Sequence, residues 1–127
     1  MIFATPSAFP VPAAMKNITL RQLKIFEAVA RHLSFSRAAE ELHLTQPAVS
    51  MQVQALEDQA GLPLTEQAGK KVRLTAAGEE VARQARRIAE QLREASEALA
   101  ALKGVESGRL KIGVVSTAKY FATSLLA

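Results

Sequence analysis

Cysteine is absent from this 127-residue chain. Disulfide bonds, thiolate metal sites and cysteine nucleophiles are therefore excluded. Long apolar runs are also missing, since no stretch approaches the roughly 20 residues that a bilayer-spanning helix requires. The first 14 residues, MIFATPSAFPVPAA, lack the basic start of a secretory signal. These absences predict a cytoplasmic protein without membrane contact, metal or other cofactor.

Catalytic groups are equally scarce. Neither His32 nor His43 has an acid, a metal ligand or a nucleophile as a plausible partner, and both are expected at the surface or in a turn. Glu40 and Glu41 are neighbours in the sequence, so they point to different faces of a helix. We therefore expect no catalytic residue and no enzyme activity.

A mild excess of positive charge is present. The chain carries 16 Lys and Arg residues against 12 Asp and Glu residues, a formal net charge of +4. This balance fits a polyanionic partner without requiring one. Residues 1–15 are expected to form a disordered extension, in which Met15 is an alternative start to Met1.

Hydrophobic spacing predicts two helices after this extension. Thr19, followed three residues later by Gln22, has the pattern of a capping box, and apolar residues then recur at helical spacing over 19–33. A second, short helix can begin at Ser34 or Ser36. Two alanines on its apolar face allow close approach of another helix.

A third helix is predicted from Thr45 to about residue 60, with Pro47 in its first turn and Gly61 after its end. The connection to the preceding helix is only a few residues long, as in a helix-turn-helix. The apolar face of the third helix carries Val49, Val53, Leu56 and Ala60. The opposite side carries Pro47, Met51, Gln54 and Asp58, with Ser50 on its shoulder, and Gln46 projects from the first turn.

These outward residues suit the major groove of DNA. Gln can pair with adenine, Ser can donate or accept, and Pro or Met can contact a thymine methyl. The first-turn N–H groups can hold a phosphate. The alternative is an ordinary amphipathic helix with a neutral polar face.

Residues 62–75 are predicted to form a small β-ribbon, or wing, with a turn at 68–71. Lys70, Lys71 and Arg73 lie at its tip and on its return strand. Such a cluster is often only a solvated turn. Beside a recognition helix, however, it can contact phosphates or reach into a minor groove.

Thr75 is the predicted N-cap of a fourth helix that Gly104 is expected to end. Its length of about 28 residues, roughly 42 Å, exceeds what a three-helix module can cover. Apolar residues recur in it at alternating spacings of 4 and 3, which is a heptad pattern typical of dimerisation. They are Val81, Ala85, Ile88, Leu92, Ala95, Leu99 and Leu102.

Residues 109–115 (RLKIGVV) are predicted to form a buried strand, and Ser116 and Thr117 can cap a helix after it. One strand and one helix cannot close a sheet. We therefore expect the beginning of a further domain.

The segment 20–64, with its core SFSRAAEELHLTQPAVS at 34–50, closely resembles the amino-terminal pattern of LysR-type transcriptional regulators. RLTAAG at 73–78 is similar to the entry into that family's linker helix. The resemblance implies a mainly α fold, with a winged helix-turn-helix over 16–75 and a linker helix over 76–103. It also implies that 104–127 is the truncated start of an effector domain that resembles periplasmic binding proteins.

The resemblance implies roles for particular residues. By motif match, Gln46, Pro47 and Ser50 are expected to read bases and Arg37 to lie near the DNA backbone, assisted by Lys70, Lys71 and Arg73 of the wing. Beside the family match, Met51 and Gln54 are further expected base-reading residues, and Ser36 and Thr45 further expected backbone contacts. Ser116 and Thr117 match the turn where the family binds an anionic effector, although plain helix capping is favoured there. Three residues depart from the family pattern: Met51 stands where Arg is frequent, Thr65 where Phe is frequent, and Gln67 where Arg is frequent.

We therefore expect a sequence-specific regulator that binds double-stranded operator DNA as a homodimer. The full-length parent is expected to be a tetramer. Truncation is expected to have removed the ability to sense the effector. TQPAVSMQV and VVSTAKYF are similar to the subgroup that controls carbon-fixation (RuBisCO) operons. The alternative is a truncated interaction protein that does not read DNA and heterodimerises with full-length regulators. Salt-dependent operator binding by the isolated chain separates the two.

Overall fold

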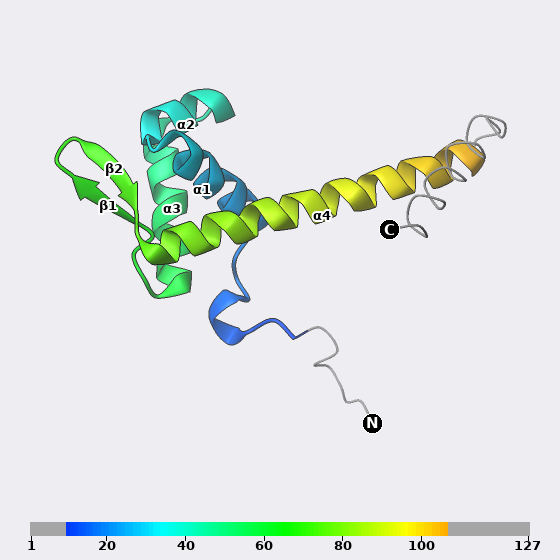
Figure 1. The fold of residues 1–127 in the computed structure, drawn as a ribbon, viewed down its shortest axis with the longest axis horizontal. Helices are drawn as coiled ribbons and strands as arrows, with labels where there is room; N and C mark the ends of the chain where they lie inside the picture. Colours follow the sequence, from blue (N-terminus) through cyan, green and yellow to red (C-terminus); the bar gives the residue numbers. More distant parts are fainter. Residues whose placement is uncertain (1–9, 107–127) are drawn as a thin grey trace. The chain divides into compact units, whose positions relative to one another are not determined.

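The computed structural model describes residues 10–106, which form helices and one hairpin (Figure 1). The elements are η2 (Ala13–Met15), α1 (Leu20–His32), α2 (Phe35–Leu42), α3 (Gln46–Ala60), β1 (Thr65–Ala68), β2 (Lys71–Leu74) and α4 (Ala76–Glu106). The predicted mainly α architecture, a winged helix-turn-helix followed by a long helix, is confirmed. The chain divides after Arg86 into two compact units, which are described separately.

Side-chain caps define where α1 and α2 begin. Thr19 Oγ1 accepts a hydrogen bond from the Gln22 N–H at 3.0 Å, and Gln22 Oε1 accepts one from the Thr19 N–H at 3.2 Å. The predicted capping box is therefore present. Ser34 caps α2 by accepting from the Arg37 N–H at 3.1 Å, which decides between Ser34 and Ser36.

The turn between α2 and α3 is short because its backbone reverses sharply. His43 adopts a left-handed conformation with φ of 57°, and Thr45 then caps α3 by accepting from the Ala48 N–H at 3.2 Å. Gly61, with φ of 76°, ends α3 in the left-handed region that glycine adopts without strain. The predicted bounds of α3 are confirmed.

The core of the first unit lies between α1, α2 and α3. Its largest fully buried side chains are Phe26, Ile25, Leu56, Leu64, Val29 and Val49. Ala38 and Ala39 of α2 are also buried, so this helix presents only methyl groups to its neighbours at these two positions. The inward face predicted for α3 is correct for Val49, Val53 and Leu56, whereas Ala60 is only half-buried.

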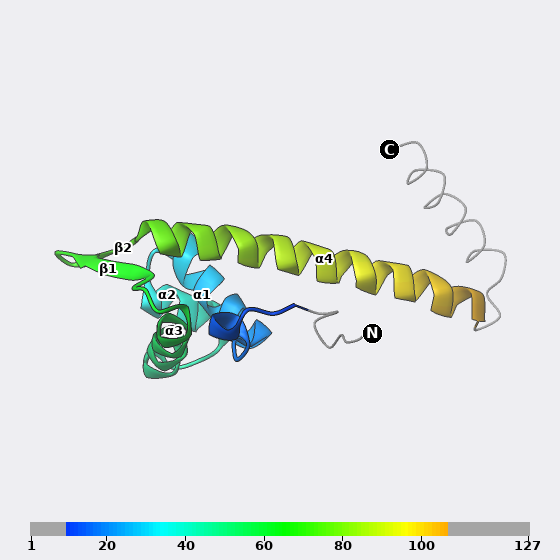
Figure 2. The same cartoon turned by 90° about the horizontal axis from the view of Figure 1, so that it is seen from below.

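Strands β1 and β2 form an antiparallel hairpin in which Thr65 pairs with Leu74 and Ala68 with Lys71. Gly69 at the tip has a φ of 68°. The hairpin extends away from α1–α3 in both views (Figures 1 and 2). The predicted wing and its turn are therefore present.

The start of α4 is joined to the chain just before the hairpin. The Thr75 N–H donates to the Leu64 carbonyl at 3.1 Å, and Thr75 Oγ1 donates to the Pro63 carbonyl at 2.7 Å. The same hydroxyl accepts from the Gly78 N–H at 3.0 Å, as an N-cap should. A Cβ on Gly78 would lie 2.0 Å from the Leu64 carbonyl oxygen, so only glycine fits there.

Helix α4 is 31 residues long and continues through Gly104 to Glu106. The prediction that Gly104 ends it is wrong. One glycine inside a helix costs only about 1 kcal/mol, so a long helix can continue through it. None of the helices in the described residues is both long and apolar enough to span a membrane. The predicted strand at 109–115, with Ser116 and Thr117, lies outside the described residues.

A surface ion-pair network joins α1 to α2. The Arg31 guanidinium donates to both carboxylate oxygens of Glu41 at 2.7 and 2.8 Å and to those of Glu27 at 3.0 and 3.1 Å. His32 Nε2 lies 2.6 Å from Glu41, so the expectation that this histidine has no acidic partner is wrong. The hydrogen bonds from Arg31, and then that from His32, lower the pKa of Glu41 to about 2.

This pKa predicts a pH dependence of stability. The pKa of Glu41 is lower in the folded protein than its ordinary value of 4.5. The contribution of the Glu41 carboxylate to the free energy of unfolding is therefore complete above about pH 4.5, and it is lost as the pH falls towards 2. We expect Glu41→Gln to be less stable than the parent in urea unfolding at pH 7, with the difference disappearing near pH 2.

Glu40→Gln is the matched control, because the Glu40 side chain makes no ion pair within residues 10–106. Glu40→Gln should leave the fall in the free energy of unfolding between pH 7 and pH 2 unchanged. A difference between Glu41→Gln and the parent that stayed constant from pH 7 to pH 2 would contradict the assignment.

Candidate nucleic-acid interface

One side of α3 is exposed along its whole length. Its residues are Gln46, Pro47, Ser50, Met51, Gln54 and Asp58, here called the α3 stripe. The helical spacing predicts this side for Pro47, Met51, Gln54 and Asp58 and places Ser50 at its edge. Gln46 is exposed because it lies in the first turn of α3. Since the opposite side is buried in the core, the α3 stripe is held facing outward by packing.

Met51 lies in the middle of the α3 stripe, and 72% of its surface is exposed. This is the largest exposed fraction among the large hydrophobic residues that the structure describes. One turn further on, the Gln54 side-chain N–H₂ donates to Asp58 Oδ1 at 3.1 Å. Gln54 would have to release this bond to pair through both amide atoms with an adenine.

The amino-terminal ends of α2 and α3 carry the polar residues expected near a DNA backbone. Ser36 and Arg37 are exposed in the first turn of α2, and the Ser36 hydroxyl lies 3.2 Å from that of Ser34. Thr45 is exposed at the start of α3. Helix N-termini have a positive electrostatic potential that favours phosphate, and the Arg37 side chain adds a full charge.

The hairpin presents its cations unequally. Lys70 and Lys71 are exposed and have no acidic partner among residues 10–106, so they are available to an anion. Arg73 instead forms an exposed ion pair with Glu66 at 3.4 Å. Gln67, where the resembled family often has Arg, is also exposed. The free positive charge of the wing is therefore concentrated at its tip.

Glu57 joins α3 to the hairpin, a role that no pattern in the sequence indicates. Its Oε2 accepts hydrogen bonds from the backbone N–H groups of Leu64 at 2.8 Å and Thr65 at 3.3 Å. These N–H groups follow the end of α3 and are part-buried, so the carboxylate replaces water as their acceptor. These two bonds connect the base of the wing to α3.

The heptad residues of α4 divide into two sets. Val81 packs against the core of the first unit, and Ala85 is buried, so both are used within the chain. Ala95 is exposed, and Ile88, Leu92, Leu99 and Leu102 are 39–58% exposed. These five form the α4 strip. Arg93, paired with Glu90 and Glu97, lies on a different side of the helix.

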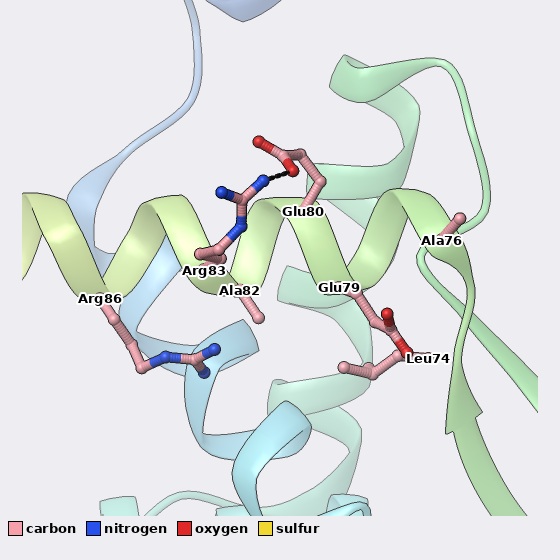
Figure 3. A pocket seen from close by; sticks show the side chains of 7 residues that line it. All are labelled: Leu74, Ala76, Glu79, Glu80, Ala82, Arg83 and Arg86. Carbon is pink, nitrogen blue, oxygen red and sulfur yellow. Dashed lines mark hydrogen bonds and ion pairs between the residues drawn. The ribbon is translucent and has the colours of Figure 1, made fainter.

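A shallow depression beside the first turns of α4 carries both acidic and basic groups (Figure 3). It is lined by Leu74, Ala76, Glu79, Glu80, Ala82, Arg83 and Arg86. Arg83 pairs with Glu80, and Arg86 lies 3.9 Å from Glu27, so the charges largely compensate one another. No cluster of metal-binding side chains occurs in the described part of the chain.

Two helices joined by a tight turn, a following β-hairpin and an outward polar face on the second helix define a winged helix-turn-helix protein. Residues 20–79 match the family described as "Bacterial regulatory helix-turn-helix protein, lysR family". The chain belongs to this lysR family.

Two curated relatives are similar over most of the chain. The RuBisCO operon transcriptional regulator of Allochromatium vinosum is 60% identical over 111 residues, which are 87% of this chain and 37% of that protein. The transcriptional regulator CfxR of Cupriavidus necator is 53% identical over 113 residues, 89% of this chain and 36% of that protein. The chain thus spans little more than a third of their length.

Two solved structures show the same fold. The DNA-binding domain of CbnR in complex with DNA has a TM-score of 0.63 and 39% identity, over 67% of this chain and 98% of that one. The DNA-binding domain of BenM in complex with catB site 1 DNA has a TM-score of 0.59 and 32% identity, over 71% of this chain and 97% of that one. These relatives are regulators and DNA-binding domains, not enzymes.

The Glu57 contact predicts a local loss of stability. Replacing a hydrogen-bonded charged acceptor leaves two part-buried N–H groups unpaired, and each such bond contributes about 1.5–3 kcal/mol. We expect Glu57→Ala to lower the free energy of unfolding by at least about 1.5 kcal/mol. Amide exchange at Leu64 and Thr65 should accelerate.

Glu57→Gln keeps one acceptor oxygen and should lose less stability than Glu57→Ala. Glu66→Ala is the control for removing an exposed carboxylate and should leave exchange at Leu64 and Thr65 unchanged. Unaltered exchange in Glu57→Ala would show that this side chain does not hold the wing.

Proposed function

We propose that this chain binds double-stranded operator DNA sequence-specifically, with α3 in the major groove, and thereby regulates transcription. The observation that carries the proposal is the α3 stripe, a row of exposed side chains on a helix whose other side is fixed in the core. The likeness to DNA-binding domains solved with DNA supports it.

Gln46, Pro47 and Ser50 are the principal base-reading residues in this proposal, with Met51 and Gln54 beside them. A glutamine can pair with adenine through two hydrogen bonds, and a serine hydroxyl can donate to or accept from several bases. Gln46 and Ser50 have no side-chain partner within the described residues, so contact with DNA requires no bond to be broken. Gln54 contributes only after it separates from Asp58.

Backbone contacts position the helix in the groove. Ser36, Arg37 and Thr45 surround the amino-terminal ends of α2 and α3, and Lys70 and Lys71 extend from the wing tip. Arg73 contributes less, because Glu66 already neutralises it in part. Each phosphate contact by a cation releases counterions, so binding should weaken steeply with salt.

A second copy of the chain is the proposed occupant of the α4 strip. Four large apolar side chains at heptad spacing are half-exposed in this structure, and covering them removes apolar surface from water. A two-fold pair of recognition helices also matches two half-sites of an operator. An interaction protein that dimerises without reading DNA would use the same strip. Operator binding by the chain alone distinguishes a DNA-binding regulator from such an interaction protein.

Regulation of a carbon-fixation operon in the cytoplasm is the biological role that we propose. Relatives named as RuBisCO operon regulators are 60% and 51% identical to this chain. In this proposal, a protein of the length of these relatives would form a tetramer and also bind a small anionic effector.

Base reading is tested by truncating the outward side chains. We expect Gln46→Ala and Ser50→Ala each to reduce the preference for the selected operator over random DNA by about 1–3 kcal/mol, since each removes a base contact. Sites are first selected from random DNA with this chain, and affinities are then measured by gel shift.

Lys70→Ala is the comparison variant, because a phosphate contact carries no sequence information. It should weaken binding to all DNA about equally and lower the salt slope by about 1. Unchanged discrimination in both Gln46→Ala and Ser50→Ala would refute the proposed base contacts.

Dimerisation is tested at the centre of the α4 strip. Leu92→Glu places two charges against each other in an apolar contact, so we expect sedimentation to show monomers. Ala100→Glu adds the same charge on another side of α4 and should remain a dimer. Dimers of Leu92→Glu at the parent's concentration would refute the α4 strip as the interface.

A further inference from the structure

Met51 is the longest apolar side chain of the α3 stripe, in which Pro47 is the other apolar residue. Its neighbours along the stripe are Pro47, one turn earlier, and Gln54, one turn later, whose amide is bonded to Asp58. Met51 lies outside the hydrophobic core, and nearly three quarters of its surface faces solvent. A long apolar side chain thus lies on the side of α3 that the proposed function places against the bases.

The chemistry of Met51 restricts which base it can face. Its thioether offers no N–H or O–H donor and is only a weak acceptor, so it cannot satisfy the edge of guanine or adenine. A polar base edge buried against it would lose water without gaining a partner. The 5-methyl group of thymine is the one apolar feature that base pairs present in the major groove.

We propose that Met51 selects thymine at one position in each operator half-site through the 5-methyl group. This inference rests on the proposed function, because it requires α3 to enter the major groove. The side chain is exposed and lies outside the core of residues 10–106, so it can reach the methyl group without leaving a packed position. Met51 is then a specificity-determining residue that acts by apolar contact instead of hydrogen bonding.

The experiment removes one methyl group at a time. Each thymine of the selected operator is replaced singly by deoxyuridine, which keeps base pairing and lacks only the 5-methyl group. Affinities are measured by fluorescence anisotropy for the parent and for Met51→Ala. We expect the parent to lose about fourfold in affinity at one position per half-site, the effect of one buried methyl-sized group.

Met51→Ala should bind the unmodified operator more weakly and show no further loss at that same position. Met51→Leu keeps an apolar side chain, so it should still lose affinity when deoxyuridine replaces thymine at that position. Met51→Arg should instead shift the preferred base at that position towards guanine. Because Met51 is exposed, all three variants should fold, and circular dichroism checks this.

Two failures are distinguishable. If the parent prefers no sequence at all, the proposed function itself is wrong. If the parent prefers its operator but Met51→Ala keeps the full deoxyuridine loss at every position, then base reading stands and the assignment to Met51 is overturned.

Discussion

The backbone of Leu64 is the point on which the arrangement of this domain depends. Its side chain is fully buried, its N–H donates to Glu57, and its carbonyl accepts from the Thr75 N–H and lies close to Gly78. One peptide segment therefore connects the end of α3, the base of the wing and the first turn of α4. No side chain could be added at Gly78 without separating these elements.

This connection gives the candidate interface its geometry. The core holds α3 so that the α3 stripe faces outward, and the bonds at Leu64 hold the hairpin beside it. Lys70 and Lys71 at the wing tip, which have no acidic partner among residues 10–106, and the exposed start of α2 then lie on elements fixed to the same core. A nucleic acid requires such a rigid set of contacts, because base reading depends on a fixed register between helix and backbone contacts.

Much of this could be predicted, because the signals act within a few residues. Thr19, Ser34, Thr45 and Thr75 cap the helices with hydroxyls that bond three residues along the chain. The helical period correctly predicts that Pro47, Met51, Gln54 and Asp58 lie on the exposed side of α3. Gly104 does not mark the end of α4, because glycine ends a helix only where the backbone turns left-handed, and that depends on the residues after it.

The amino-acid sequence alone was enough to predict the four helices, the caps at Thr19, Thr45 and Thr75, the hairpin turn and the side of α3 that faces away from the core, since each depends on local hydrogen bonds or on periodicity. It left Ser34 and Ser36 open as the cap of α2, and it misplaced the end of α4 at Gly104. The role of Glu57, the contact of Gly78 with Leu64 and the Arg31–Glu41 network emerged only in the folded molecule. So did the use of Val81 and Ala85 by the chain's own domain, while the α4 strip stays exposed. These features join residues that are distant in sequence, and only packing determines which of them meet.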